Sequence, residues 1–158
     1  MQTSITSLPF HAHALLAVIV LFSSAPARAD TAEIPMHEVR SGAFYIKGNL
    51  GGLVDTDLLL DTGSGYVSLS QQTFDLIRDD ATTVFQRHIT GIMANGRKES
   101  VPIYRIGELR LTSECILRNI EVAVFRSTSR DILGLNALMQ IQPITLQLDP
   151  PLMTATCS

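Results

Sequence analysis

The chain has 158 residues, 46% of them hydrophobic, and a formal net charge of −3 at pH 7. This length fits one domain with a core of useful size. The 12 Lys and Arg residues form no basic block, which argues against a nucleic-acid partner.

The first 29 residues have the layout of an export signal. An apolar run, ALLAVIVLF at residues 14–22, is followed by small residues and by an A-x-A site that ends at Ala29. The run is too short for a bilayer span, which needs about 20 residues. We predict a signal peptide at 1–29, cut after Ala29, an exported protein and no stable membrane span after cleavage. Because residues 1–13 contain no Lys or Arg, an uncleaved membrane anchor is the alternative.

Short extended segments follow the signal. We expect a polar lead-in at residues 30–42 and a domain at residues 43–158. Alternation over residues 43–50 and 54–60, separated by Gly51 and Gly52, predicts a β-hairpin. Ser70 is placed to cap a short helix over residues 71–77, with Phe74 and Ile77 on one face.

A second hairpin is predicted from strands at residues 84–93 and 101–106, with Asn95-Gly96 as its turn. Short strands at 108–112, 116–117 and 120–125 follow, then a helical turn at 136–141 and a final strand at 144–148. Many short strands between turns predict an all-β barrel or sandwich with one or two short helices. Tyr66 and Tyr104 are expected to pack in the sheet, with a pocket-lining role as the alternative.

Asp61 stands out because it directly follows three leucines at residues 58–60, so its backbone emerges from the core. Thr62, Gly63 and Ser64 offer hydroxyls and an unhindered amide that could orient the carboxylate. Two such carboxylates face to face share a proton, so one can activate a water while the other protonates a carbonyl oxygen. Since the sequence supplies one such loop, the second Asp61 must come from a second copy of the chain.

Three hypotheses stay open for this loop at this stage. The first is catalysis by paired Asp61 carboxylates. The second is a β-domain that binds peptides or an envelope partner, in which Asp61 only caps a strand. The third is a disulfide-stapled structural protein that would tolerate Asp61→Ala.

The cysteines and histidines give weaker signals. An exported chain meets oxidising conditions, so Cys115 and Cys157 are expected to form a disulfide; two unpaired cysteines are the alternative. His37 and His88 are isolated and lack ligand-like spacing, so no metal site is predicted. No cofactor is predicted.

Two motifs together resemble the retropepsin-like aspartic proteases, in particular the exported bacterial single-domain group. The first is the apolar-apolar-Asp-Thr-Gly-Ser stretch of residues 59–64, and the second is Asp-Ile-Leu-Gly-Leu-Asn-Ala-Leu at residues 131–138. The likeness covers roughly residues 44–148. It implies a closed β-barrel of one lobe that pairs as a two-fold dimer.

The resemblance also implies roles for particular residues, in a periplasmic homodimer that cleaves peptides or proteins. Asp61, Thr62 and Gly63 would be catalytic. Ser64, Ile132, Leu133 and Gly134 would support the catalytic loop, with the Ser64 hydroxyl bonded to the outer Asp61 oxygen. Met93, Ala94, Asn95 and Gly96 would form a substrate-covering flap, although any exposed hairpin could show the same turn.

The chain departs from retroviral members of that family at two places. Those members carry an acidic residue after the Asp-Thr-Gly loop and an Arg after the downstream glycine. Gly65 and Leu135 stand there in this sequence. Both halves of the ion pair are missing, so no charge is orphaned, and a dimer contact of the retroviral kind is not expected.

Overall fold

The computed structural model describes residues 31–39, 42–92, 96–126 and 130–157. Within these ranges, ten strands form one sheet with three short helical segments beside it, so the all-β prediction is confirmed. The strands are β1 (Thr31–Val39), β2 (Ala43–Leu50), β3 (Val54–Leu60), β4 (Val67–Ser70), β5 (Val84–Ile92), β6 (Lys98–Arg110), β7 (Ile116–Phe125), β8 (Asp131–Leu133), β9 (Ile144–Leu148) and β10 (Pro151–Thr156). The helical segments are α1 (Gln71–Asp75), α2 (Leu135–Leu138) and the 3₁₀ helix η1 (Met139–Ile141).

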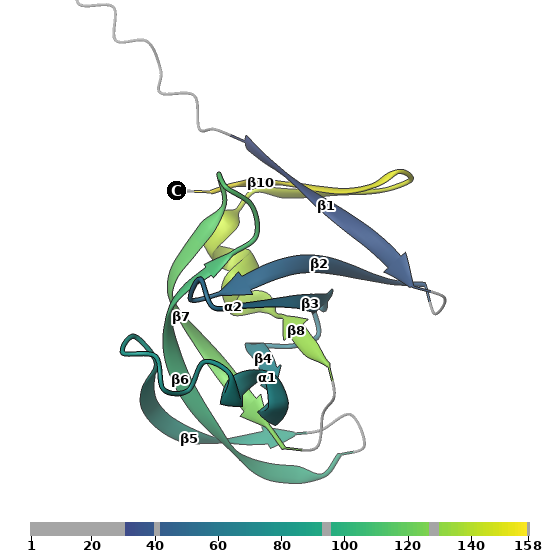
Figure 1. Ribbon diagram of the computed structural model, residues 1–158. Helices are drawn as coiled ribbons and strands as arrows, with labels where there is room; N and C mark the ends of the chain where they lie inside the picture. Colours follow the sequence, from purple (N-terminus) through teal and green to yellow (C-terminus); the bar gives the residue numbers. More distant parts are fainter. Residues whose placement is uncertain (1–30, 40–41, 93–95, 127–129, 158) are drawn as a thin grey trace, which may run out of the picture.

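The sheet closes partly on itself. Its strand order is β5-β6-β7-β4-β8-β3-β2-β1-β10-β9, and β6 also pairs with β2 through Leu109 opposite Leu50. This second pairing turns the strands from β6 to β2 into a ring. β5 extends the sheet beyond the ring at one end of the molecule, and β1, β10 and β9 extend it at the other (Figure 1). The expected barrel is therefore a partial ring with two open extensions.

Most of the segment expected as a polar lead-in forms a strand, β1. Ala32, Ile34 and Met36 are buried there while the residues between them are exposed. β1 pairs with β10, a strand that the sequence did not predict, and then with β2. Because three apolar residues alternate with polar ones, the average composition is polar, and only the pairing partners reveal the strand.

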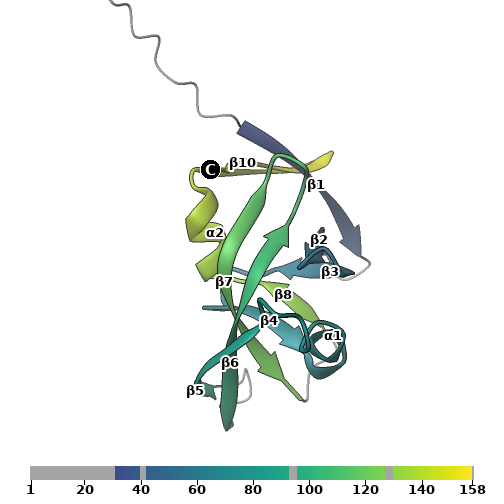
Figure 2. The ribbon, with the colours of Figure 1, turned by 60° about the vertical axis from the view of Figure 1, so that its left-hand side comes forward.

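Two long strands replace several short ones that the sequence predicted. β6 and β7 each run unbroken, and they lie side by side along the molecule (Figure 2). Asn119 has a positive φ of 53°, yet pairing continues on both sides of it, with Glu108 opposite Arg118 and Ile106 opposite Ile120. The turn signals near residues 112–119 separate β6 from β7 but do not interrupt β7 at Asn119. Pairing with β6 on both sides of Asn119 overrides the local turn propensity there.

Local signals in the first half of the domain are confirmed. Gly51 and Gly52 both have positive φ and join β2 to β3 as the predicted hairpin. The Ser70 hydroxyl accepts the backbone N–H of Thr73 at 3.1 Å and so caps α1. Phe74 and Ile77 are buried as expected.

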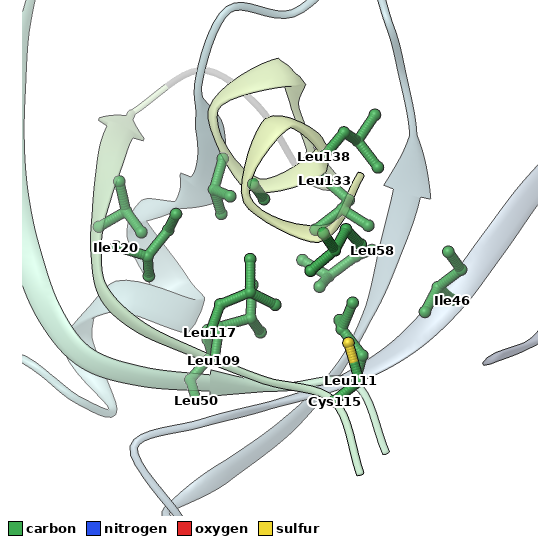
Figure 3. Close-up of a cluster of buried hydrophobic side chains, with 14 of the residues drawn as sticks. Ile46, Leu50, Leu58, Leu109, Leu111, Cys115, Leu117, Ile120, Leu133 and Leu138 are labelled. Carbon is green, nitrogen blue, oxygen red and sulfur yellow. The ribbon is translucent and has the colours of Figure 1, made fainter. Parts of the chain in front are cut away.

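The main core lies inside the ring, under α2. Figure 3 shows Leu58 of β3 and Leu133 of β8 below the helix, with Leu138 of α2 at its side, and all three belong to the same core cluster. Each such buried side chain contributes on the order of 1.5–3 kcal/mol relative to exposure. The strands that carry the Asp61 loop and the downstream glycine are thus anchored in the same core.

Cys115 and Cys157 form the expected disulfide, with 5.1 Å between their Cα atoms. The bond ties the end of β10 to the turn before β7, and loop closure over 42 residues gives a stabilisation of about 3–4 kcal/mol. In the described ranges, no helix has the length and apolar character to cross a membrane.

Candidate active site

Asp61 lies where two parallel strands end. β3 and β8 run in parallel, with Leu58 opposite Asp131 and Leu60 opposite Leu133. The backbone N–H of Asp61 then donates to the carbonyl oxygen of Leu133 at 3.2 Å. Asp61 and Gly134 therefore leave the sheet at the same edge, although they are far apart in sequence.

The loop after β3 orients the Asp61 carboxylate. The amide of Gly63 donates to Oδ1 of Asp61 at 2.8 Å, and the amide of Ser64 donates to the Asp61 carbonyl oxygen at 3.3 Å. A Cβ atom at Gly63 would lie only 3.1 Å from that Oδ1. Asp61 is half-buried, whereas Thr62 and Gly63 are exposed. The arrangement holds one carboxylate in a fixed direction at the surface of the core.

Ser64 makes a different bond from the predicted one. Its hydroxyl donates to the carbonyl oxygen of Tyr66 at 2.8 Å, not to the outer oxygen of Asp61. The hydroxyl of Ser68 also donates to this carbonyl, at 3.3 Å. In this single chain, Ser64 therefore stabilises the course of the loop and does not touch the carboxylate.

The downstream element packs directly under the loop, as the resemblance implied. The amides of Leu135 and Asn136 donate to the carbonyl oxygens of Ser64 and Gly65, at 2.8 and 3.2 Å. Gly134 leaves no room for a side chain, because a Cβ there would overlap the Tyr66 carbonyl oxygen. Ile132 and Leu133 hold the strand that delivers this glycine.

Asn136 locks the two elements together. Its Oδ1 accepts the amide of Val67 at 2.7 Å, and its Nδ2 donates to the carbonyl oxygen of Glu121 at 2.8 Å. One side chain thus joins the end of the loop, α2 and β7. The sequence showed Asn136 within the downstream motif but gave no sign of these partners.

Asp131 is a second carboxylate near the loop, and its contacts are structural. It is buried and accepts hydrogen bonds from the Ser70 amide at 2.7 Å, the Thr56 hydroxyl at 2.6 Å and the Thr73 hydroxyl at 2.7 Å. Both carboxylate oxygens are therefore occupied. A charge at the first position of a buried strand is the only sequence signal for this role.

Arg87 of β5 connects the β5–β6 hairpin to Tyr66, which follows the Asp61 loop. The Arg87 guanidinium binds both oxygens of Glu121, at 2.6 and 2.7 Å, and also donates to the Tyr66 hydroxyl at 3.3 Å. These hydrogen bonds lower the pKa of Glu121 and raise that of Arg87. The Tyr66 ring packs on the cluster of Val101, Ile103 and Ala123, so the expected packing role is confirmed.

The predicted flap is a hairpin of β5 and β6. Met93, Ala94 and Asn95 lie outside the described residues, and Gly96 has a positive φ of 78°. The role of these four residues as a flap stays a prediction.

An open, mainly apolar pocket lies beside the Asp61 loop. Its volume is about 430 Å³, and it is lined by Thr62, Leu135, Leu138, Met139, Gln142, Pro143 and Ile144. Thr62 is the immediate neighbour of Asp61, so the pocket continues the surface on which the carboxylate lies. Leu135, which replaces the retroviral arginine, forms part of this apolar wall.

Comparison with known proteins supports the fold. The chain resembles the crystal structure of a retropepsin-like aspartic protease from Rickettsia conorii, with a TM-score of 0.62 and 21% sequence identity over 81% of this chain and 92% of that chain. The fold is that of a retropepsin-like aspartic protease. The sequence matches no protein-family model and no curated protein. At this identity the retropepsin-like likeness establishes the architecture, and the chemistry has to be argued from the Asp61 loop itself.

Proposed function

We propose that this protein is an exported aspartic endopeptidase that acts as a homodimer. The observation that carries the proposal is the Asp61 loop: a carboxylate oriented by the Gly63 amide at the end of a buried strand, in a retropepsin-like fold. Thr62 and Gly63 complete the catalytic loop. Ser64, Ile132, Leu133 and Gly134 support it.

The proposed reaction uses one Asp61 from each subunit, with a single proton shared between them. The ionised carboxylate takes a proton from water while the water oxygen bonds to the peptide carbonyl carbon. The protonated carboxyl gives its proton to the carbonyl oxygen, which yields a tetrahedral diol. The C–N bond then breaks as the carboxyl that took the water proton gives it to the nitrogen and the other carboxylate takes a hydroxyl proton from the diol, which leaves a carboxylic acid and an amine and restores the dyad.

The pairing of two subunits follows from the chemistry and from the surface beside Asp61. In the described ranges, Asp131 is the carboxylate on β8, the strand that pairs with β3 beside the loop. Its oxygens are already occupied by hydrogen bonds. A second Asp61 is therefore needed. Thr62 joins the catalytic loop to the apolar pocket, where Leu135 and Met139 are 39% and 65% exposed. A second copy would cover this surface and bring its own Asp61 to the axis.

The edge strand β9 offers the means of pairing. It ends the described sheet, with β10 on one side only. Leu146 and Leu148 on β9 are 41% and 58% exposed. Antiparallel pairing of β9 with the same strand of a second copy would satisfy the two-fold symmetry and bury these leucines.

We expect the active protein to be exported, to the periplasm or outside the cell. The Cys115–Cys157 disulfide favours an oxidising compartment. The predicted cut after Ala29 would remove the signal and leave β1 almost at the new N-terminus.

Cleavage of a mixed peptide library by the exported, purified protein tests the proposal. Activity should be measured from about pH 3 to 8, a range that brackets the titration of a shared dyad. Asp61→Asn should abolish cleavage. Asp79→Asn is the matched control, because the Asp79 side chain is 94% exposed, and it should cleave like the parent.

The same samples separate the alternatives. Sedimentation should give a mass near twice that of the chain, and the intact mass should identify Asp30 as the first residue. A folded monomer that cleaves no peptide at any pH contradicts the proposal and favours the non-catalytic binding domain. Cleavage that survives Asp61→Asn would assign the activity to other residues.

A further inference from the structure

Glu99 lies near the start of β6, on the same face of the strand as Val101 and Ile103. Val101 and Ile103 on the same strand belong to the buried cluster against which Tyr66 packs. Side chains two apart on a strand share a face, so Glu99 continues this row.

The opposite strand gives an independent check of that direction. Gly91 of β5 pairs with Glu99, and a Cβ at Gly91 would lie 2.9 Å from Val101 Cγ2 and 3.6 Å from Phe125 Cε1. The glycine therefore faces the same side as Val101 and Phe125. It also leaves the space beside Glu99 without a cross-strand side chain.

One oxygen of the Glu99 carboxylate lacks a hydrogen-bond partner in the described residues. Its Oε2 atom is shielded from solvent and has no hydrogen-bond partner there, and no ion pair of the described chain involves it. Glu121, by contrast, has both oxygens bound by Arg87. A shielded carboxylate oxygen without a donor carries a free-energy penalty that a bound cationic group would remove.

We propose that Glu99 is the acceptor for a basic side chain of the peptide substrate. This inference rests on the proposed function and adds a substrate preference to it. A Lys or Arg side chain has an aliphatic stem that can lie on the partly buried Phe125 ring, and a charged head that can reach Glu99. Hydrogen bonds between charged partners are roughly twice as strong as neutral ones, so the preference is measurable.

Peptide cleavage with a charge-neutral mimic of arginine tests the proposal. The substrates are fluorogenic decapeptides with an apolar central pair, in which one Arg is moved through the remaining positions. A second set carries citrulline, which has nearly the shape of Arg without its charge. At one position, kcat/KM should be about tenfold higher for Arg than for citrulline.

Three variants assign that preference to Glu99. Glu99→Gln should bring the Arg-to-citrulline ratio close to one, and Glu99→Lys should favour a peptide with Glu at that position. Glu114→Gln is the matched control, since it removes the same charge at an exposed turn, and it should keep the ratio. Thermal melting establishes that each variant is folded.

Failure of the inference can be told apart from failure of the proposed function. If peptides are cleaved without an Arg preference, or with one that survives Glu99→Gln, the inference is wrong while the peptidase stands. If nothing is cleaved, anisotropy of labelled peptides on the parent protein decides. If the parent protein binds the Arg peptide more tightly than the citrulline peptide and Glu99→Gln removes this difference, the result supports the Glu99 site without the peptidase. Equal binding of the two peptides to the parent protein overturns the inference.

Discussion

Gly134 lies against the carbonyl oxygen of Tyr66 so closely that a Cβ atom at the glycine would overlap this oxygen. The contact joins the downstream strand end to the loop that carries Asp61, and the Leu135 amide donates to the Ser64 carbonyl next to it. The position of the carboxylate therefore depends on backbone packing as much as on its own hydrogen bond.

Gly134→Ala should destabilise the protein by more than about 2 kcal/mol, because the obstructing atom is backbone and cannot move aside cheaply. Gly65→Ala is the control, since nothing lies within 4 Å of a Cβ at Gly65. Denaturant unfolding of both variants measures the effect. Equal stability of the two would show that the loop can shift to accept the methyl group.

Asp131 should matter for folding and not for the proton chemistry. Asp131→Ala leaves the Ser70 amide and the Thr56 and Thr73 hydroxyls without their acceptor, and we expect a loss of about 3 kcal/mol. Asp131→Asn should cost less, because the amide oxygen can still accept from Ser70 and the hydroxyls can rotate to accept from its NH₂ group. Unfolding curves give both values. A larger loss for Asn than for Ala would contradict this account.

The Arg87–Glu121 pair should give a pH-dependent contribution to stability. Arg87 lowers the pKa of Glu121 below its ordinary value of 4.5, so the contribution is present above that value. It is lost as the pH falls through the lowered pKa. Glu121→Gln should therefore be less stable than the parent at neutral pH, by a small amount because solvent screens the half-exposed pair, and the gap should narrow in acid.

Thermal melts of the parent and of Glu121→Gln, recorded about once per pH unit between pH 3 and 7, measure how the stability difference changes with pH. Arg87→Met and the double variant complete a double-mutant cycle. A stability difference that grows in acid would show that another titrating group dominates the pH dependence.

The sequence predicts those parts of the fold that depend on neighbouring residues. The Gly51-Gly52 hairpin and the Ser70 cap follow from turn and capping chemistry alone. The Asp61 loop could be identified because its motif is contiguous. These signals need no knowledge of what packs against them.

The parts that sequence could not supply depend on distant partners. β1 is recognisable as a strand only beside β10, and the ring closes only where Leu50 meets Leu109. The Thr56 hydroxyl reaches Asp131 across 75 positions, and a single sequence has no pattern that marks such a pair. The unexpected Ser64 contact has the same origin, since its hydroxyl chooses among acceptors that only the folded loop brings near.

Leu146→Lys combined with Leu148→Lys should weaken the proposed dimer. Both side chains are exposed on the free edge strand β9, and charge repulsion across a two-fold axis opposes pairing. We expect the dimer dissociation constant to rise at least about tenfold, and peptide cleavage to become strongly dependent on protein concentration.

Leu53→Lys is the control for the β9 variant. Leu53 is 57% exposed at the β2–β3 turn, away from β9, and its replacement should leave the dissociation constant unchanged. Sedimentation over a dilution series measures all three proteins, and cleavage assays at the same concentrations follow the activity. A dimer that resists the double substitution would move the interface away from β9, and activity that stays constant while the dimer dissociates would contradict the need for two Asp61 carboxylates.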